Sequence, residues 1–401
     1  MRRQRGLVGL MGLAALVGLG VTAKPAAARV TTEQSASILV FPKVIADGTR
    51  DTIIQITNTS NNMRHAHCFY VNGALTDPAL PPGPLNPPLW TEIDFDIWLT
   101  KQQPTHWVVS SGRLDNSLDK PCKRSVAGSM PVVCDPATSG TSNADCCDAG
   151  FDPGRVPPVV PDFTGELKCI EVDASGFPVP GNALKGEATL EDIATGDVSK
   201  YNAIGLKGFD TNNMDGVLCL GGGVTADCPS GAEYEACPQT WLLDHPAVGA
   251  PDPVVEQQQF CTTAGSCSTS VATNLTVVPC TEDFENQAPL PVTLQFAITN
   301  EYEQTFSAST TFTCWASFDL EDINPIFQAS SLGGNILQTR MRSAAGTQRG
   351  VMAVLEETHS VSTTSPALSF VTRAAQNAHT TFQDQTGPDL ITIPADQIQG
   401  Q

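Results

Sequence analysis

Three carboxylates stand at alternate positions in the segment 92–96, which reads Glu92-Ile93-Asp94-Phe95-Asp96. Apolar residues fill the positions between them, and this period of two predicts a β-strand over 91–99 with its carboxylates on one face. Neighbouring carboxyl groups can carry out acid–base or nucleophilic chemistry when one is protonated and the other is ionised. We therefore take this face as the first candidate for catalysis.

The motif at 92–96 resembles the strand motif of the laminarinase-type retaining glycoside hydrolases, which are secreted β-jelly rolls. The resemblance implies that Glu92 would be the nucleophile, Asp94 its helper and Asp96 the acid/base, with Trp90 or Trp98 stacking on a sugar. The chain departs from the family pattern because Asp96 replaces the acid/base glutamate. The match covers five of 401 residues, and a solvated strand face whose charges oppose edge-to-edge pairing explains the same pattern.

Two histidines, His65 and His67, lie two positions apart in a second predicted strand, 65–71. On a strand both rings point to one face, and a metal there would need a third and usually a fourth ligand. The other histidines are scattered along the sequence and belong to no motif. We expect two partly buried strand histidines at this point rather than a metal site.

The segment 210–216 is similar to a calcium-binding loop, with Asp210, Asn212 and Asp215 as the candidate ligands. Calcium prefers carboxylate and carbonyl oxygens on a tightly turning backbone. The spacing is one residue longer than in an EF-hand, however, and no glutamate closes the loop. A polar turn before the next strand is the alternative, so we expect no cofactor, with calcium at this loop as the open possibility.

Short strand signals separated by turn residues run through most of the chain. The segments 52–57 and 65–71 flank a polar turn at 58–62 and predict a hairpin, and 292–299 and 310–320 do so around 300–304. Many short strands with turns between them predict an all-β fold, here an antiparallel β-sandwich of immunoglobulin-like or jelly-roll-like type. We expect both ends of the chain to build it, around a long disulfide-rich and loop-rich insertion.

The expected organisation has four parts. Residues 1–28 are a signal peptide, 35–120 the first half of the sandwich, 121–290 a cysteine-rich insertion with some strands, and 291–398 the second half. A row of two separate domains is the alternative.

The chain has 13 cysteines, an odd number, so at least one thiol is unpaired or bonds to another molecule. Cys68 and Cys314 lie in predicted framework strands, where they are either partners or a buried pair that never oxidises. All 13 are candidates for disulfides: Cys68, Cys122, Cys134, Cys146, Cys147, Cys169, Cys219, Cys228, Cys237, Cys261, Cys267, Cys280 and Cys314.

The first residues carry three arginines, a short apolar run and a small-residue end, as a secretory signal does. Cleavage after residue 28 would change the formal net charge from −20 to −24, because four basic residues leave with the signal. Such a charge repels nucleic acid and anionic lipid. No later stretch is long and apolar enough to span a membrane. We expect a secreted, cell-surface or periplasmic protein with no integral membrane anchor and no nucleic-acid partner.

The segments 66–72 and 389–394 resemble those of uncharacterised secreted, cysteine-containing, β-rich proteins of Gram-negative bacteria. That resemblance implies a compartment and no mechanism. The function we predict is non-catalytic: binding a protein or glycan at the cell surface, or a structural role there. One alternative is a carbohydrate-active enzyme that uses Glu92, Asp94 and Asp96. The other is a self-assembling subunit of a surface layer or filament, which would have an unpaired strand edge.

Overall fold

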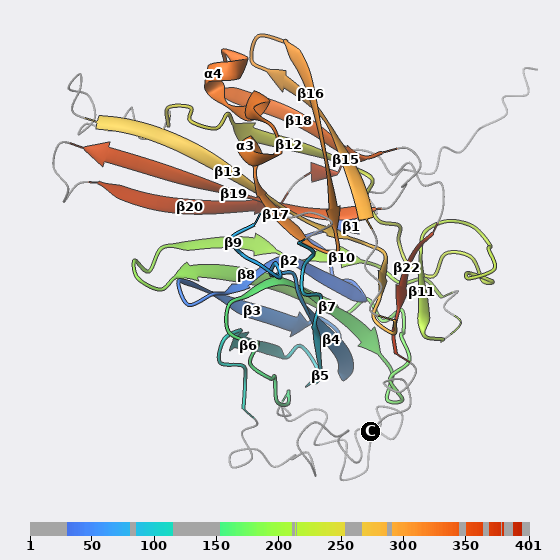
Figure 1. Cartoon of the computed structure of the whole chain (residues 1–401). Coiled ribbons are helices and arrows are strands. Elements are labelled where there is room, and N and C mark those ends of the chain that lie inside the picture. Colours follow the sequence, from blue (N-terminus) through green and yellow to red (C-terminus); the bar gives the residue numbers. More distant parts are fainter. Residues whose placement is uncertain are drawn as a thin grey trace, which may run out of the picture.

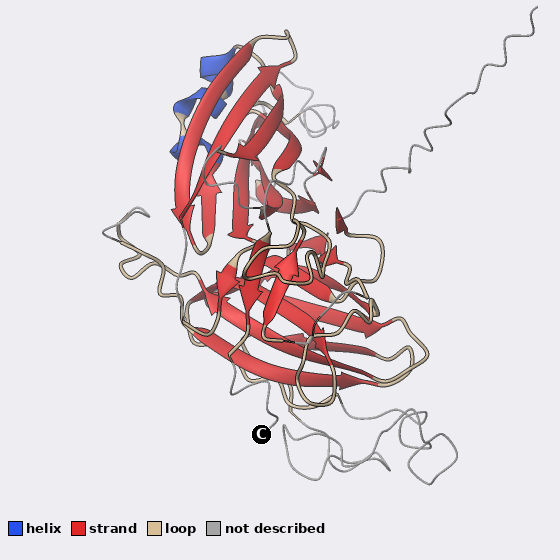
Figure 2. Cartoon of the chain, turned by 90° about the vertical axis from the view of Figure 1, so that its right-hand side faces the viewer, coloured by secondary structure: helices blue, strands red, loops and turns tan. Residues whose placement is uncertain are grey.

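The computed structural model describes residues 30–80, 86–114, 153–210, 213, 215–252, 267–286, 291–344, 350–363, 369–377, 379–380 and 388–394. Strands dominate these residues. The helical segments among them are short: α3 (Leu320–Ile323), η3 (Pro325–Phe327) and α4 (Ala329–Leu332). Figure 2 shows the helices in blue at one end of a molecule that is otherwise built of strands. The prediction of an all-β chain is confirmed.

The first sheet has six antiparallel strands in the order β1-β10-β2-β7-β4-β5. β2 is buried along its whole length, and β4 and β7 nearly so. Strands that are covered on both faces read as nearly continuous apolar runs rather than alternations. The bounds are β1 (Val30–Thr31), β10 (Ile204–Leu206), β2 (Ile38–Ala46), β7 (Phe163–Val172), β4 (Arg64–Asn72) and β5 (Glu92–Leu99).

The second sheet covers one face of the first sheet. A hydrophobic core draws on both sheets, with Phe41 from β2, Ile54 from β3 and Trp107 from β6 among its members. The Trp107 indole also donates a hydrogen bond of 2.5 Å to the buried Tyr70 hydroxyl of β4. The strands of the second sheet are β6 (Pro104–Val108), β3 (Arg50–Asn58), β8 (Leu184–Asp192) and β9 (Val198–Asn202), in that order.

Three further sheets contain the rest of the strands. In the view of Figure 1 the first and second sheets lie below, the fourth and fifth above, and β11 and β22 of the third to the right. The third is β11 (Val217–Leu220), β22 (Asp389–Thr392) and β14 (Glu282–Asp283). The fourth is β16 (Thr305–Thr313), β15 (Pro291–Asn300), β18 (Ile336–Ser343), β12 (Thr240–Pro246) and β21 (His379–Thr380). The fifth is β17 (Ala316–Asp319), β13 (Cys267–Pro279), β19 (Val351–Thr363) and β20 (Phe370–Asn377).

The larger hydrophobic core lies against the other face of the first sheet. Val40 and Phe69 of the first sheet join it, together with Phe284, which follows β14, Phe296 of β15 and Leu355 of β19. Phe69 and Phe284 stack with their ring centroids 4.5 Å apart. The third, fourth and fifth sheets are therefore packed onto the first sheet rather than standing apart from it.

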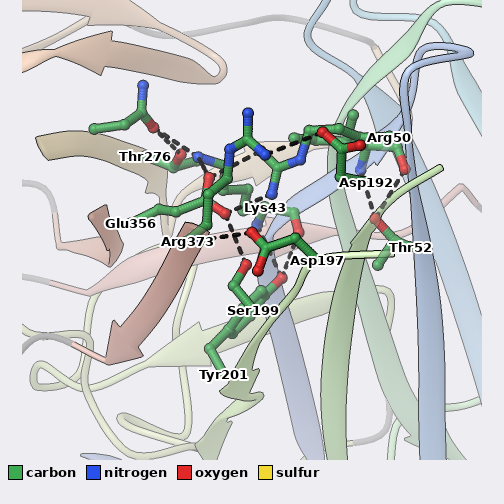
Figure 3. A network of polar contacts seen from close by, with 12 residues as sticks. Lys43, Arg50, Thr52, Asp192, Asp197, Ser199, Tyr201, Thr276, Glu356 and Arg373 are labelled. Atoms are coloured by element: carbon green, nitrogen blue, oxygen red, sulfur yellow. Dashed lines mark hydrogen bonds and ion pairs between the residues drawn. The ribbon is translucent and has the colours of Figure 1, made fainter. Parts of the chain in front are cut away.

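A buried polar network joins the first and second sheets to the fifth (Figure 3). At its centre Glu356 of β19 contacts Lys43 Nζ at 2.8 Å and the guanidinium of Arg50, and it accepts a 2.7 Å hydrogen bond from Ser199. Burial by itself would raise the pKa of Glu356. The charges of Lys43 and Arg50 outweigh that effect and lower the pKa to about 2.

Asn274 of β13 extends this network. Its side-chain oxygen accepts hydrogen bonds from Lys43 and from Ser317, both of 2.7 Å, and its amide nitrogen donates to Asp319 at 3.0 Å. A second set of contacts connects β9 and β20, where Asp197 accepts from the backbone N–H of Arg373 at 2.8 Å. Asn274, Asp197 and Arg373 are half-buried, and charged and amide groups that are withdrawn from water contribute to stability only when they are paired, as they are here.

Three disulfides are present among the described cysteines: Cys68–Cys169, Cys219–Cys228 and Cys237–Cys280. Cys267 is disulfide-bonded as well. Disulfides persist in oxidising compartments, so these bonds support the expected extracellular or periplasmic environment. Five of the predicted disulfide cysteines lie outside the described residues: Cys122, Cys134, Cys146, Cys147 and Cys261.

Cys68 and Cys314 are not partners, so that expectation is wrong. Cys68 on β4 lies directly opposite Cys169 on β7, and Cys314 is buried and free. Among the described cysteines, Cys314 is the unpaired thiol. Within the described residues, no helix is both long enough and apolar enough to cross a membrane. The signal peptide expected at 1–28 lies outside those residues.

The prediction of one antiparallel β-sandwich with a loop-rich insertion is wrong. The strands are divided among five small, blade-like sheets and not between the two layers of a sandwich. β7, from the segment expected to be an insertion, lies between β2 and β4 in the first sheet. The physical reason is that a period of two shows which face of a strand is buried, but not which sheet covers it.

One of the two predicted hairpins forms. β15 and β16 pair continuously around a turn in which Asn300 accepts hydrogen bonds from the backbone N–H groups of Tyr302 and Gln304, both at 3.0 Å. The other prediction is wrong, because β3 and β4 belong to different sheets. After β3 the Asn58 amide donates to the carbonyls of Leu99 and Thr100, and the chain crosses to the first sheet.

Candidate binding site

The carboxylates of 92–96 lie on β5, at the edge of the first sheet and beside β4. Antiparallel pairing sets His67 opposite Asp96 and His65 opposite Trp98. Because alternate residues of paired strands share a face, the three carboxylates and the two histidines lie on the same side of the sheet. The sequence identified both groups but gave no indication that they meet.

Each histidine contacts carboxylates. His65 Nε2 lies 2.7 Å from Asp96 Oδ1, and His65 Nδ1 lies 2.9 Å from the Asp173 carbonyl oxygen. His67 lies 3.3 Å from Asp94 and 3.4 Å from Asp96. Both nitrogens of His65 are thus occupied. In the part of the chain that the structure describes, no group of three or more His, Cys, Asp or Glu residues is placed to hold a metal ion.

Glu92 is the half-buried first carboxylate of this face. Burial, together with the charges of Asp94 and Glu282, raises the pKa of Glu92 to about 7. Glu282 belongs to a buried group in which Lys168 Nζ lies between Glu166, at 2.7 Å, and Glu282 itself. Burial and the charge of Glu282 raise the pKa of Glu166 well above its usual value. This group therefore favours holding a proton among its buried carboxyls.

Neither tryptophan offers a face to a sugar. Trp98 is 7 % exposed and stacks on His65 with ring centroids 3.8 Å apart. Trp90 is 5 % exposed, with its ring 6.3 Å from that of Phe284. The catalytic roles that the resemblance implies for Glu92, Asp94 and Asp96 stay predictions. Because both tryptophans are buried, neither presents the ring face on which a sugar would stack in those roles.

The predicted calcium loop has its own internal hydrogen bonds. Asp215 accepts from the Asn213 amide at 2.7 Å and from the Val217 backbone N–H at 2.8 Å. Asp210 is exposed, and Asn212 lies outside the described residues. The contacts at Asp215 are those of a polar turn, which is the alternative that the sequence left open.

A hollow of about 620 Å³ lies over the fourth sheet, where no sequence motif predicted a site. The strands β15, β16 and β18 run side by side there. Their outward residues alternate with buried ones in β15 and β18 and mostly with half-buried ones in β16. The lining consists mainly of hydroxyl, amide and guanidinium groups. Its outward side chains are Gln295, Ala297, Ser307, Ser309, Arg340 and Arg342.

Two arginines of β18 give this hollow its charge. Arg340 and Arg342 point outward, while Met341 between them is buried in the larger core. Arg342 donates two hydrogen bonds to Gln295 Oε1, at 3.2 Å from Nε and 2.9 Å from Nη2, which orient its guanidinium. Neither arginine forms an ion pair with a described carboxylate. Two uncompensated cations thus lie side by side in a chain of net charge −20.

Two other hollows lack such cations. One of about 880 Å³ beside β20 is bordered by Arg373, but this arginine is paired with Asp192 at 3.1 Å. Another of about 570 Å³ is lined by Trp315 and mostly apolar or small residues, with no basic side chain in its lining. The hollow over the fourth sheet is therefore the one of these three whose chemistry points to an anionic group on a ligand.

One signal for this site is present in the sequence, although it belongs to no recognised motif. In residues 337–343 inward positions alternate with outward ones, and two of the outward positions are Arg340 and Arg342. Two arginines on one strand face are notable because acidic residues outnumber basic ones by 42 to 22 in the whole chain. Neither arginine is close in sequence to β15 or β16, so the lining could not be assembled without the strand order.

No family model matches the chain, and no curated protein matches it. The class of protein therefore rests on the structure itself. It is a disulfide-bonded all-β protein with a polar, arginine-bearing hollow on one sheet.

Proposed function

We propose that the chain is an exported, disulfide-stabilised protein with a non-catalytic binding role at the cell surface or outside the cell. Its ligand is a glycan that carries isolated carboxylate groups among neutral sugars, bound in the hollow over β15, β16 and β18. The observation that carries this proposal is the pair Arg340 and Arg342, which have no carboxylate partner among the described residues.

The lining of the hollow supports a sugar ligand of this kind. Ser307, Ser309 and Gln295 offer hydroxyl and amide groups that can exchange hydrogen bonds with sugar hydroxyls. A guanidinium binds a carboxylate through two parallel N–H···O bonds, and Arg342 is already oriented by Gln295. The roles of these residues are to bind and orient, with no step of bond cleavage.

The charge of the chain narrows the ligand further. A net charge of −20 repels a dense polyanion as a whole. A sparsely acidic glycan suffers less repulsion and still offers a carboxylate to the arginine pair. We therefore expect selectivity for weakly acidic glycans over both neutral and densely sulfated ones.

Binding to an array of neutral, sparsely carboxylated and densely sulfated glycans tests the proposal. We expect binding to the sparsely carboxylated class, reduced about tenfold or more by Arg340→Ala or by Arg342→Ala, because a hydrogen bond to a charged group contributes about 1.5–3 kcal/mol. Lys200→Ala removes an exposed cation from β9 and should leave binding unchanged. Equal binding by all variants, or no binding to any glycan class, would overturn it.

A further inference from the structure

β16 is the outermost strand of the fourth sheet, and it lacks the features that usually protect such an edge. Its nine residues contain no charged side chain and no proline, and its register with β15 runs without a bulge. Of its described residues only the last, Thr313, forms a backbone hydrogen bond outside the pairing with β15: its carbonyl accepts from the Trp315 N–H at 2.8 Å. Natural sheets seldom leave an edge of this length open, because it can pair with another chain.

The other sheet edges differ. β5 carries three carboxylates, and its Trp98 N–H is bonded to the Pro153 carbonyl at 2.9 Å. β9 and β20 face one another, joined by contacts such as Asn377 Nδ2 to the Asn202 carbonyl at 2.8 Å. The remaining edges are five residues long or shorter: β1, β6, β11, β14, β17 and β21. β16 therefore stands out as the long, uncharged edge of the described structure.

The sequence of β16 is similar in both directions, with the same residue types at five of its nine positions. It reads Thr-Phe-Ser-Ala-Ser-Thr-Thr-Phe-Thr, with Ser309 at the centre. If two copies pair antiparallel about Ser309, Thr305 meets Thr313, Phe306 meets Phe312, and Ser307 meets Thr311. Ala308 meets Thr310 as the one unlike pair, and every other pair is identical or joins two hydroxyl side chains. Cross-strand pairs are the unit of sheet stabilisation.

We propose that two copies of this chain associate through β16, antiparallel and centred on Ser309, to form one continuous sheet across a two-fold axis. An interface of this kind uses the same surface on both partners, as a two-fold axis requires. Alternate outward positions on the strand, Thr305, Ser307, Ser309 and Thr311, are exposed. α3 approaches the strand from the side of the larger core, where the half-buried Phe306 also packs.

The dependence on salt distinguishes this association from one driven by charge. Each copy has a net charge of −20, so the two repel one another, while the interface strand is uncharged. Salt screens the repulsion and leaves strand pairing in place. Dimerisation should therefore strengthen as the ionic strength rises. Ser307 and Ser309 belong both to this strand edge and to the lining of the glycan hollow, but the association itself needs no glycan.

Cysteine crosslinking on the full chain tests both the partner and the register. Paired residues have Cβ atoms about 4.5–5.5 Å apart, so Ser309→Cys alone should give a disulfide-linked dimer on oxidation. Ser307→Cys alone should not, but a mixture of Ser307→Cys and Thr311→Cys chains should crosslink. The unaltered chain is the control: its free thiol Cys314 is buried, so it should form no crosslinked dimer.

Light scattering of the unaltered and Ser309→Lys chains provides a second measurement. Ser309→Lys sets two ammonium groups against one another at the axis, so we expect at least a tenfold weaker dimer. The melting temperature should be unchanged at protein concentrations where both chains are monomeric. Ser309→Thr should dimerise like the unaltered chain. A monomer at all protein and salt concentrations would overturn the proposal. Crosslinking of Ser307→Cys alone with none for Ser309→Cys would overturn the register.

Discussion

Arg50 of β3 and Glu356 of β19 form a two-pronged ion pair, with 2.9 Å from Nη1 to Oε2 and 2.5 Å from Nη2 to Oε1. The two residues are 306 positions apart in the sequence. Glu356 also holds the buried Lys43 (Figure 3). One carboxylate thus contacts two cations at the junction between the first, second and fifth sheets.

Replacing Glu356 by glutamine should destabilise the chain strongly. The change leaves Lys43 and Arg50 without a counter-charge in a buried place, and losing one member of a buried ion pair costs about 3–5 kcal/mol. Urea unfolding of Glu356→Gln measures the free energy of unfolding. Lys200→Gln is the matched control, because its pair with Glu187 is exposed and worth about 1 kcal/mol or less. Equal losses in the two variants would refute the central role of Glu356.

Stability should fall on both sides of a mildly acidic pH. The pKa of Glu356 is lowered to about 2 from 4.5, so its contribution is complete above 4.5 and is lost as the pH falls toward 2. Burial raises the pKa values of Glu92 and Glu171 to about 7, so stability declines as the pH rises from 4.5 through 7. Urea unfolding between pH 2 and pH 8 should show a maximum near about pH 5.

The decline toward neutral pH can be assigned by a single substitution. Glu92→Gln keeps the shape of the side chain and removes its titration, so the slope between pH 5 and pH 7 should become shallower. Glu285→Gln, at an exposed position after β14, should leave the slope as it is. An unchanged slope in Glu92→Gln would show that this carboxyl titrates normally in the folded chain.

The Cys68–Cys169 bond should contribute more to stability than Cys219–Cys228. The first closes a separation of 101 residues and the second one of 9. The entropy of the unfolded chain gives about 4.7 kcal/mol for a loop of about 100 residues and less than about 3 kcal/mol for one shorter than 15. Unfolding of the two double alanine variants under oxidising conditions measures both losses, and the reverse order would contradict this account.

Cys314 should be inert in the folded chain. Burial raises the pKa of its thiol well above the usual range, and the thiolate is the reactive form. Iodoacetamide should therefore modify Cys314 in urea but not in native buffer, as read by peptide mass mapping. Cys314→Ser should remove that modified peptide. Rapid modification of the native chain would show that the thiol is accessible.

The sequence predicted the strands better than their partners. The alternation at 91–99 located β5, and the polar turn at 300–304 located the hairpin of β15 and β16, because both signals are local. The partner of Cys68 depended on β7 lying beside β4, which no local pattern reports. An antiparallel sandwich was the wrong conclusion for the same reason.

The candidate site shows the same division. The period of two placed Glu92, Asp94 and Asp96 on one face, but their meeting with His65 and His67 followed from strand pairing. The hollow with Arg340 and Arg342 joins β18 to the hairpin of β15 and β16. In the sequence, the positive charge of this hollow is visible only as two arginines at alternate positions of one strand.

The network around Asn274 has a consequence for producing the protein. Asn274-Leu275-Thr276 and Asn58-Thr59-Ser60 are acceptor triplets for N-linked sugars in a eukaryotic secretory host. The folded chain uses both amide nitrogens, that of Asn274 toward Asp319 and that of Asn58 toward Leu99 and Thr100. A glycan attached before folding would occupy the place of these contacts. Such a host should therefore yield folded chains that carry no sugar at Asn58, whose side chain is fully buried.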